Sequence, residues 1–262
     1  MRENLRELYK YRELLYMVAY RDIKVRYKQS IMGFMWAILM PILIVAAGII
    51  VRYAYALAGH NQLQTSDFAS VAIKSVPWAF LVSSIRFGCN SLILGNRELV
   101  TKIYFPKEVL PLASVMSSLF DFAIASLTLV VFLAVMKTHI SLVLLWAPVL
   151  LVALIALASG IGMLVAAASL FFRDVKYIVE VLLTFGIFFT PVFYDTRMLG
   201  DKGKWLMLNP VAPLLEGLSA SITHQSLPAL TWIAYSLVFA AVSFFGGYVF
   251  FKHLEPVFAE SI

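Results

Sequence analysis

The chain has 262 residues, of which 61% are hydrophobic and only 14% are charged, and its mean hydropathy is +0.87. Soluble globular domains carry about 25% charged residues, so this composition excludes an ordinary soluble domain and predicts an all-α membrane protein. The net charge is +6, but the basic residues flank apolar runs, so we expect no nucleic-acid binding. Cys89 is the single cysteine, which excludes an intrachain disulfide and a cysteine-based metal site.

Residues 1–30 are too polar to cross a membrane, yet apolar side chains recur among their charges. This pattern predicts an amphipathic helix that lies in the membrane interface, with its apolar side in lipid and its basic side toward the headgroups. The first long apolar run begins near Ile31, after a long charged lead. We therefore interpret it as a retained first span and not as a cleavable signal peptide.

Apolar runs of about 20 residues are needed to cross the hydrocarbon core of a bilayer. The sequence offers six candidates, at about 31–55, 71–95, 109–136, 141–170, 176–194 and 229–251. The fourth is rich in alanine, glycine and serine, which predicts close packing between helices. Six spans put both termini on the same side of the membrane. Lysine and arginine are more frequent in the segments on that side than on the opposite side, so we expect both termini in the cytoplasm.

The segment from Asp195 to Pro228 does not have the composition of an ordinary exposed loop. Its stretch KWLMLNPVAPLLEGLSASI is strongly apolar, and Pro210 and Pro213 divide it into pieces too short to span. We predict re-entrant or interfacial helices here, with their backbone buried in protein.

Catalytic patterns are missing from the sequence. The four histidines fall at span ends or in loops without a second ligand at metal spacing, and neither H-E-x-x-H nor G-x-S-x-G occurs. The phosphate-binding pattern G-x-x-x-x-G-K-[ST] is also missing, so any ATP hydrolysis must come from another chain. We therefore do not expect an enzyme.

Arg86 and Asp121 stand out among the ionisable residues because they lie at depth in predicted spans, a position that is rare and often functional. Arg86 lies about 13 Å from the inner face and Asp121 about 19 Å, at a rise of 1.5 Å per residue. The difference of about 6 Å is within reach of an arginine side chain, so the two are predicted to form an intramembrane ion pair. The pair is either structural or part of a functional site.

Three stretches carry distinctive motifs. They are RDIKVRYKQSIMGFMWAILMP from Arg21, NRELVTKIYFPKEVLPLASV from Asn96, and FFRDVKYIVEVLLTFGIFFTPVFY from Phe171, with LNPVAPLLEG following at Leu208. These stretches resemble the ABC-2 type polysaccharide export permeases, and they occur in that family's order along the whole chain. The resemblance is strongest to O-antigen exporter permeases, with teichoic-acid and capsule permeases near them.

The resemblance implies a homodimer that carries two copies of a separate ABC ATPase, which binds ATP and magnesium, so that this chain needs no cofactor. It implies that the N-terminal helix, the loop after the second span and the turn after the fourth contact the ATPase. The residues expected to couple the two proteins are Arg21, Arg26, Asn96, Arg97, Glu98, Lys102, Lys107, Arg173 and Asp174. The alternative is that these charges only set the membrane topology.

Aromatic side chains suit a path for a glycan, because sugar rings stack on them and can slide. The candidates are Phe34, Trp36, Tyr53, Tyr55, Phe185, Phe188, Phe189, Phe193 and Tyr194. Aromatic residues at span ends also serve as interfacial anchors, which is the competing interpretation. The outer segment around Trp205–Gly217 would form either an extracytoplasmic gate or a cap on the dimer.

These features together predict a permease that exports a lipid-linked, O-antigen-like polysaccharide across the bacterial inner membrane, in contact with membrane lipids. Other exported substrates remain possible: teichoic acid, capsule, or a smaller lipid or drug. A membrane scaffold for glycan synthesis is the alternative from a different class.

Overall fold

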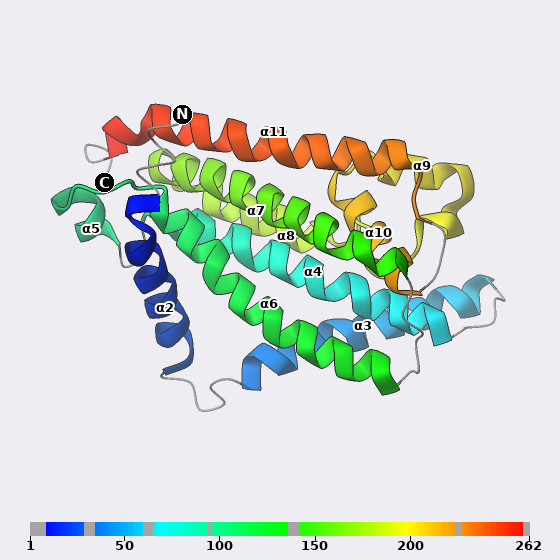
Figure 1. The fold of residues 1–262 in the computed structure, drawn as a ribbon. Helices are drawn as coiled ribbons and strands as arrows, with labels where there is room; N and C mark the ends of the chain where they lie inside the picture. The colour runs from blue at the N-terminus through cyan, green and yellow to red at the C-terminus, as the bar shows by residue number, and fades with distance from the viewer. Residues whose placement is uncertain are drawn as a thin grey trace.

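The computed structural model describes residues 9–28, 35–59, 65–93, 96–135, 142–223 and 227–258. These residues form helices joined by turns, and no strand occurs among them (Figure 1). The long helices are α3 (Met35–Gly59), α4 (Thr65–Asn90), α6 (Val109–Val135), α7 (Trp146–Phe171) and α11 (Leu230–Leu254). The shorter ones are α2 (Arg12–Lys28), α5 (Arg97–Lys102), η1 (Leu142–Leu145), α8 (Val175–Gly186), η2 (Thr196–Lys202), α9 (Gly203–Leu206), α10 (Val211–Thr223) and η3 (Glu255–Val257).

The elongated bundle has two ends, which we call the terminal end and the distal end. At the terminal end, Tyr11 near the N-terminus and Phe258 near the C-terminus pack on one hydrophobic cluster with α5 and the start of α6. At the distal end, Arg52 at the end of α3 meets Asp195 and the start of α4. The long helices run between these two ends (Figure 1).

Five helical segments of the described chain are long and apolar enough to cross a membrane: Met35–Leu57, Ser66–Asn90, Val109–Val135, Val143–Phe171 and Leu230–Val257. They correspond to the first four predicted spans and to the last. The described chain is therefore all-α, as predicted, and several of its helices are long and apolar enough to cross a membrane.

The predicted span at 176–194 is wrong as a continuous helix. Helix α8 has 12 residues and ends at Gly186, which gives a length of about 18 Å against a hydrocarbon core of about 30 Å. Turns follow up to Asp195, and Pro191 disfavours helix at Thr190 and cannot donate a backbone hydrogen bond. The chain nevertheless passes along the bundle here, because Phe171 packs on Phe258 at the terminal end while Asp195 lies at the distal end.

The small residues of α7 allow its neighbours to approach closely, as the sequence predicts. A Cβ atom added to Gly160 would lie 2.2 Å from the backbone oxygen of Ser243 in α11, and one added to Gly247 would lie 2.4 Å from the oxygen of Gly160. On the α4 side, a Cβ atom on Gly88 would lie 3.2 Å from the Cα of Gly162. Only glycine therefore fits the contact between α7 and α11.

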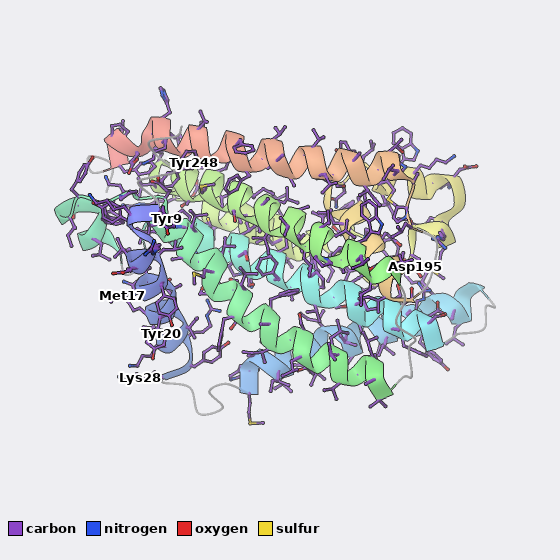
Figure 2. All side chains as sticks on the ribbon, in the orientation of Figure 1. Tyr9, Met17, Tyr20, Lys28, Asp195 and Tyr248 are labelled. Carbon is purple, nitrogen blue, oxygen red and sulfur yellow. The ribbon has the colours of Figure 1, made fainter. Side chains whose placement is uncertain are left out.

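Helix α2 lies across the direction of α11 at the terminal end and packs against α6 (Figure 1). Val18 and Ala19 are buried, whereas Met17 and Tyr20 are exposed and point away from the bundle (Figure 2). This geometry is compatible with a helix on the membrane surface, which stays a prediction.

Helix α10 is the main helical piece of the segment from Asp195 to Pro228. Pro213 lies in its first turn, where proline is tolerated because its missing N–H needs no partner. Nearly all of α10 is buried, mainly against α4 and α7. The segment does consist of short helices, and α10 begins directly after Pro210, but the predicted break at Pro213 is wrong because α10 continues through it. A re-entrant position in a membrane stays a prediction.

Candidate functional site

Five charged side chains meet inside the distal end. Arg52, which is 3% exposed, lies 2.5 Å from the Oδ1 atom of Asp67 and 2.8 Å from the Oδ2 atom of Asp195. Lys74 is fully buried, and its Nζ atom lies 2.6 Å from the Oδ1 atom of Asp195 and 3.7 Å from the Oε1 atom of Glu216. The described residues thus carry a buried ionic network, called the distal cluster.

Neutral groups complete the hydrogen bonding of the distal cluster. Ser70 donates to Asp195 at 2.9 Å and accepts from Ser219 at the same distance. The backbone N–H of Thr196 donates to Glu216 at 2.9 Å. Because buried charges are tolerated only when they are paired and hydrogen-bonded, this network fixes α3, α4 and α10 to the segment that begins at Asp195.

Burial and the two cations act in opposite directions on the pKa values of the carboxyl groups in the distal cluster. Burial alone would raise the pKa of Asp195, but Lys74 and Arg52 outweigh it and lower the pKa to about 2. The pKa of Glu216 is raised, first by burial and then by Asp195, although Lys74 opposes the rise.

At the terminal end, α2 is hydrogen-bonded to the start of α5. The Nη2 atom of Arg21 donates to the Oδ1 atom of Asn96 at 2.7 Å, and the Nδ2 atom of Asn96 donates to the backbone oxygen of Ser91 at 2.7 Å. Asn96 is buried, so this contact fixes the direction in which α5 leaves α4.

The loop from Ile103 to Glu108 is fixed to the C-terminal end of α11. Lys252 lies 2.9 Å from Glu108 and 2.8 Å from Glu255, and Glu255 also accepts from the backbone N–H of Lys107 at 2.9 Å. Burial raises the pKa of Glu108. Tyr104 in this loop is 89% exposed and borders a hollow of about 540 Å³.

The predicted ion pair between Arg86 and Asp121 is wrong, because each residue has another partner. Asp121 pairs with Arg26 and accepts from the hydroxyl of Tyr27 at 2.5 Å, since α2 crosses the bundle next to α6. Arg86 instead forms two hydrogen bonds to Glu180 of α8, at 2.6 and 2.8 Å. Both side chains of this second pair are about half exposed, at 41% and 50%.

A cavity of about 480 Å³, called the α3 groove, separates the terminal half of α3 from α4 and α6. The end of α2 also borders it. Its lining includes Arg26, Trp36, Trp78, Arg86 and Asp121. The predicted partners Arg86 and Asp121 thus face one cavity without contacting each other.

Comparison with known proteins identifies the family to which the chain belongs. The family model of the ABC-2 type transporter matches residues 13–223, which extend from α2 to the end of α10. The chain belongs to the ABC-2 type transporter family. It is 31% identical, over 98% of both chains, to the O-antigen export system permease protein RfbA of Myxococcus xanthus. It is 29% identical to the protein of the same name from Klebsiella pneumoniae, over 82% of this chain and 81% of that one.

Family membership identifies the chain as the permease component of a membrane transporter, and it implies an ABC ATPase partner. For this ABC-2 transporter, the described contacts of Arg21, Asn96 and Arg26 are internal ones. Arg21 and Asn96 bond each other, and Arg26 is paired with Asp121. An ATPase contact by these three side chains stays a prediction.

The other predicted coupling residues of the transporter are only partly described. Arg173 and Asp174 are exposed in the turn between α7 and α8, and Lys107 is half-buried. The side chains of Arg97, Glu98 and Lys102 lie outside the described part of the structure. Their role in coupling therefore stays a prediction.

The predicted path aromatics separate into two groups. Phe185, Phe188 and Phe189 are exposed on α8 and the following turn, as are Tyr53 and Tyr55 near the distal end of α3, and Tyr194 and Trp36 are partly exposed. Phe193 does not fit a path, because it is buried against the position of Gly48, where an added Cβ atom would lie 2.6 Å from its ring. Phe34 lies outside the described residues.

Sequence reasoning missed Glu180 and the distal cluster. Both cations of the distal cluster, Arg52 and Lys74, lie within long apolar helices. Their position inside apolar runs was the available signal, together with Asp195 and Glu216 in a segment otherwise poor in acidic residues. The pairs that Asp195 forms with Arg52 and Lys74 join residues more than 100 positions apart and have no local signature.

Proposed function

We propose that this chain exports a lipid-linked polysaccharide of the O-antigen type, from the cytoplasmic side across the bacterial inner membrane. It acts as a homodimer with two copies of a separate ABC ATPase, which binds ATP and magnesium. The observation that carries the proposal is the similarity to an O-antigen export permease over nearly the whole length of both chains.

In this proposal the chain crosses the membrane six times and keeps both termini in the cytoplasm. Five crossings use the long apolar helices, and the sixth is α8 together with the turns up to Asp195. Helix α2 lies in the interface at the cytoplasmic face, and α10 is a re-entrant helix near the opposite face. The burial of α10 supports this position, since non-helical or short segments at membrane depth need protein around them.

The pair formed by Arg86 and Glu180 supports a polar path along α4 and α8. An ion pair that is half exposed at membrane depth is costly against lipid, so it faces either water or another protein chain. Phe185, Phe188 and Phe189 follow on the same segment and expose aromatic rings on which sugars can slide. We place the glycan path along this surface, between two copies of the permease.

The ATPase docks at the terminal end, on α5 and the loop that follows it. Tyr104 projects from this loop, which the ionic contacts of Glu108, Lys252 and Glu255 hold rigidly on α11. The exposed turn at Arg173 and Asp174 is the second contact. A rigid loop with an exposed aromatic side chain can transmit movement of a soluble partner to α6 and α11.

The function is tested with the permease and its ATPase reconstituted in vesicles. A lipid-linked glycan should stimulate ATP hydrolysis and become accessible on the opposite side, and an ATPase without hydrolytic activity provides the control. A transporter of small drugs would ignore the glycan, and a scaffold would show no coupling, so either result would reject the proposal.

Docking is tested separately by co-purification of the ATPase. The variant Tyr104→Ala should retain less ATPase than wild type, while Tyr53→Ala, which removes another exposed tyrosine side chain but near the distal end, should retain as much. Equal retention by both variants would reject this docking surface.

A further inference from the structure

We propose that the α3 groove binds one anionic phospholipid of the leaflet on the terminal side, and that this lipid supports the terminal half of α3. The bound molecule is a component of the surrounding bilayer and not the exported substrate. The inference therefore depends on the chain lying in a membrane but not on which substrate it exports.

The lining of the α3 groove is charged at one end and mainly apolar beyond it, as a phospholipid molecule is. Arg26, Arg86 and Asp121 supply charged groups near the terminal end, whereas the lining beyond them includes Val76 and Trp78. From Arg86 to Val76 the groove follows α4 for ten residues, which corresponds to about 15 Å. In the structure Arg86 lies four residues, or about 6 Å, before the end of α4 at Asn90, so its long side chain reaches the headgroup level. One leaflet contributes about half of the 30 Å hydrocarbon core, so a single acyl chain of that leaflet fits the apolar part of the groove.

The charge at the polar end favours an anionic headgroup. Arg26 and Arg86 are each paired with a carboxylate, so the excess positive charge near this end comes from Lys24 and Lys28, which are exposed on the last two turns of α2. Glu180, the partner of Arg86, does not line the groove. A guanidinium carries five N–H donors, and the bonds to Glu180 engage two nitrogen atoms of Arg86, so donors remain for a phosphate oxygen.

The packing of α3 explains why the groove needs an occupant. The distal half of α3 is fixed by Arg52 and by the close approach of Gly48 to Val71. In the terminal half, Met40 is 52% exposed and Pro41 removes one backbone hydrogen bond of the helix. Protein interiors contain few voids larger than a water molecule, so an apolar opening of about 480 Å³ in a bilayer is filled by a chain from that bilayer.

The dimensions of the α3 groove favour an acyl chain of a phospholipid over a polyprenyl chain. Its length matches one acyl chain within one leaflet, whereas a polyprenyl chain that anchors a glycan is several times longer. Its volume lies within the range of about 300–1,000 Å³ that single small ligands occupy. An acyl chain of an ordinary phospholipid is therefore the better fit.

Trp78 provides a direct optical test because it lines the groove and is 7% exposed. A chain that keeps only Trp78, with its other four tryptophans changed to Phe, is reconstituted in phosphatidylcholine with increasing brominated phosphatidylglycerol. Quenching of the Trp78 fluorescence should saturate as the brominated phosphatidylglycerol increases. The mole fraction at half-maximal quenching should be roughly tenfold lower than for brominated phosphatidylcholine, because one charge-assisted hydrogen bond strengthens binding by about that factor. A matched chain that keeps only Trp232, on α11, should be quenched in proportion to the brominated fraction of either lipid.

The headgroup preference is tested by Arg86→Gln in the chain that keeps only Trp78. This variant should lose the preference for phosphatidylglycerol, while Lys204→Gln at the distal end should keep it. Proportional quenching of Trp78, or equal midpoints for the two lipids, would overturn the proposal. Saturable quenching that a polyprenyl diphosphate reverses would overturn it as well, because the groove would then hold the substrate anchor.

Native mass spectrometry of the unmodified chain gives a readout that needs no substitution. After removal of lipid and titration with phosphatidylglycerol, one molecule per chain should remain bound under conditions that release phosphatidylcholine. Retention of neither lipid, or of both equally, would contradict a specific anionic site.

Discussion

Replacing Asp195 by asparagine should markedly lower the unfolding temperature of the protein. The substitution preserves the shape of the side chain but leaves the buried cations Arg52 and Lys74 with one anion fewer. Lys74 then keeps only the 3.7 Å contact to Glu216 as an ion pair within the described residues. The variant therefore tests whether the distal cluster holds the segment that begins at Asp195.

The structure gives the size of the effect. The neighbouring cations lower the pKa of Asp195 from its ordinary value of 3.8 to about 2. At about 1.4 kcal/mol for each pH unit, the folded state favours the carboxylate by roughly 2 kcal/mol. Breaking a buried pair by removing one partner typically costs about 3–5 kcal/mol. A loss of about 3 kcal/mol lowers the Tm by roughly 6–12 °C, by the scaling of soluble domains of this size.

Thermal unfolding in detergent can be followed with a dye that becomes fluorescent when it reacts with a thiol. Cys89 is the single cysteine of the chain and is buried, so the dye reacts when the bundle opens. The control is Asp201→Asn, which removes a carboxylate from an exposed pair with Lys204 and should change the Tm little. The double variant Asp195→Asn with Lys74→Met should recover part of the loss, because it also removes the unpaired cation.

Two results would refute this reasoning. In the first, Asp195→Asn unfolds at the same temperature as Asp201→Asn, which would mean that the buried pairs do not stabilise the fold. In the second, the double variant is no more stable than the single one, which would mean that the loss does not come from an unpaired buried charge.

Three further expectations follow from the packing and the charges. Gly160→Val should lower the Tm strongly, because its Cβ atom would lie 2.2 Å from a backbone oxygen of α11. Gly246→Val should not lower it, because a Cβ atom there meets no atom within 4 Å. Equal Tm values for the two variants would contradict the close contact of α7 and α11. The stabilisation by Asp195 is complete above a pH of about 4 and disappears as the pH falls toward 2, because the unfolded chain takes up the proton first. Unfolding of wild type and Asp195→Asn across this range should therefore converge at low pH, and a constant difference would exclude this carboxylate as the cause. Arg26→Gln should reduce glycan export without lowering the amount of permease in the membrane, because it removes the ion pair that holds the end of α2 on α6. The control Lys28→Gln, which alters an exposed residue two positions later, should export normally.

The sequence contained enough information to predict the long helices. Each is an apolar run of more than 20 residues, and such runs form helices in lipid because every backbone group must be hydrogen-bonded within the chain. The close packing of α7 also followed from its composition, since only small residues allow helices to approach within a few ångströms. These properties are local, which is why they can be read from one segment at a time.

The failures have a common physical reason, since they concern relations between segments. Counting apolar residues extended α8 by eight residues, because the count ignored the charges of Lys176 and Glu180 on one side of this short helix and the effect of Pro191. The pair of Arg86 and Asp121 was inferred from depth alone, as if both helices ran perpendicular to the membrane. In the structure, the partners of both residues come from α8 and α2, whose directions across the bundle no spacing in the sequence reveals.

The short length of α8 has a consequence for how the chain is inserted during synthesis. A segment of 12 helical residues that contains Lys176 and Glu180 has little tendency to partition from the translocon into lipid, unlike the uninterrupted apolar run of α7 before it. The passage of residues 175–194 to the distal end therefore depends on contacts with other segments, among them the ion pairs of Asp195 with Arg52 and Lys74, which are synthesised much earlier. Insertion of this part of the permease is thus expected to be a late step that needs α3 and α4 already in place.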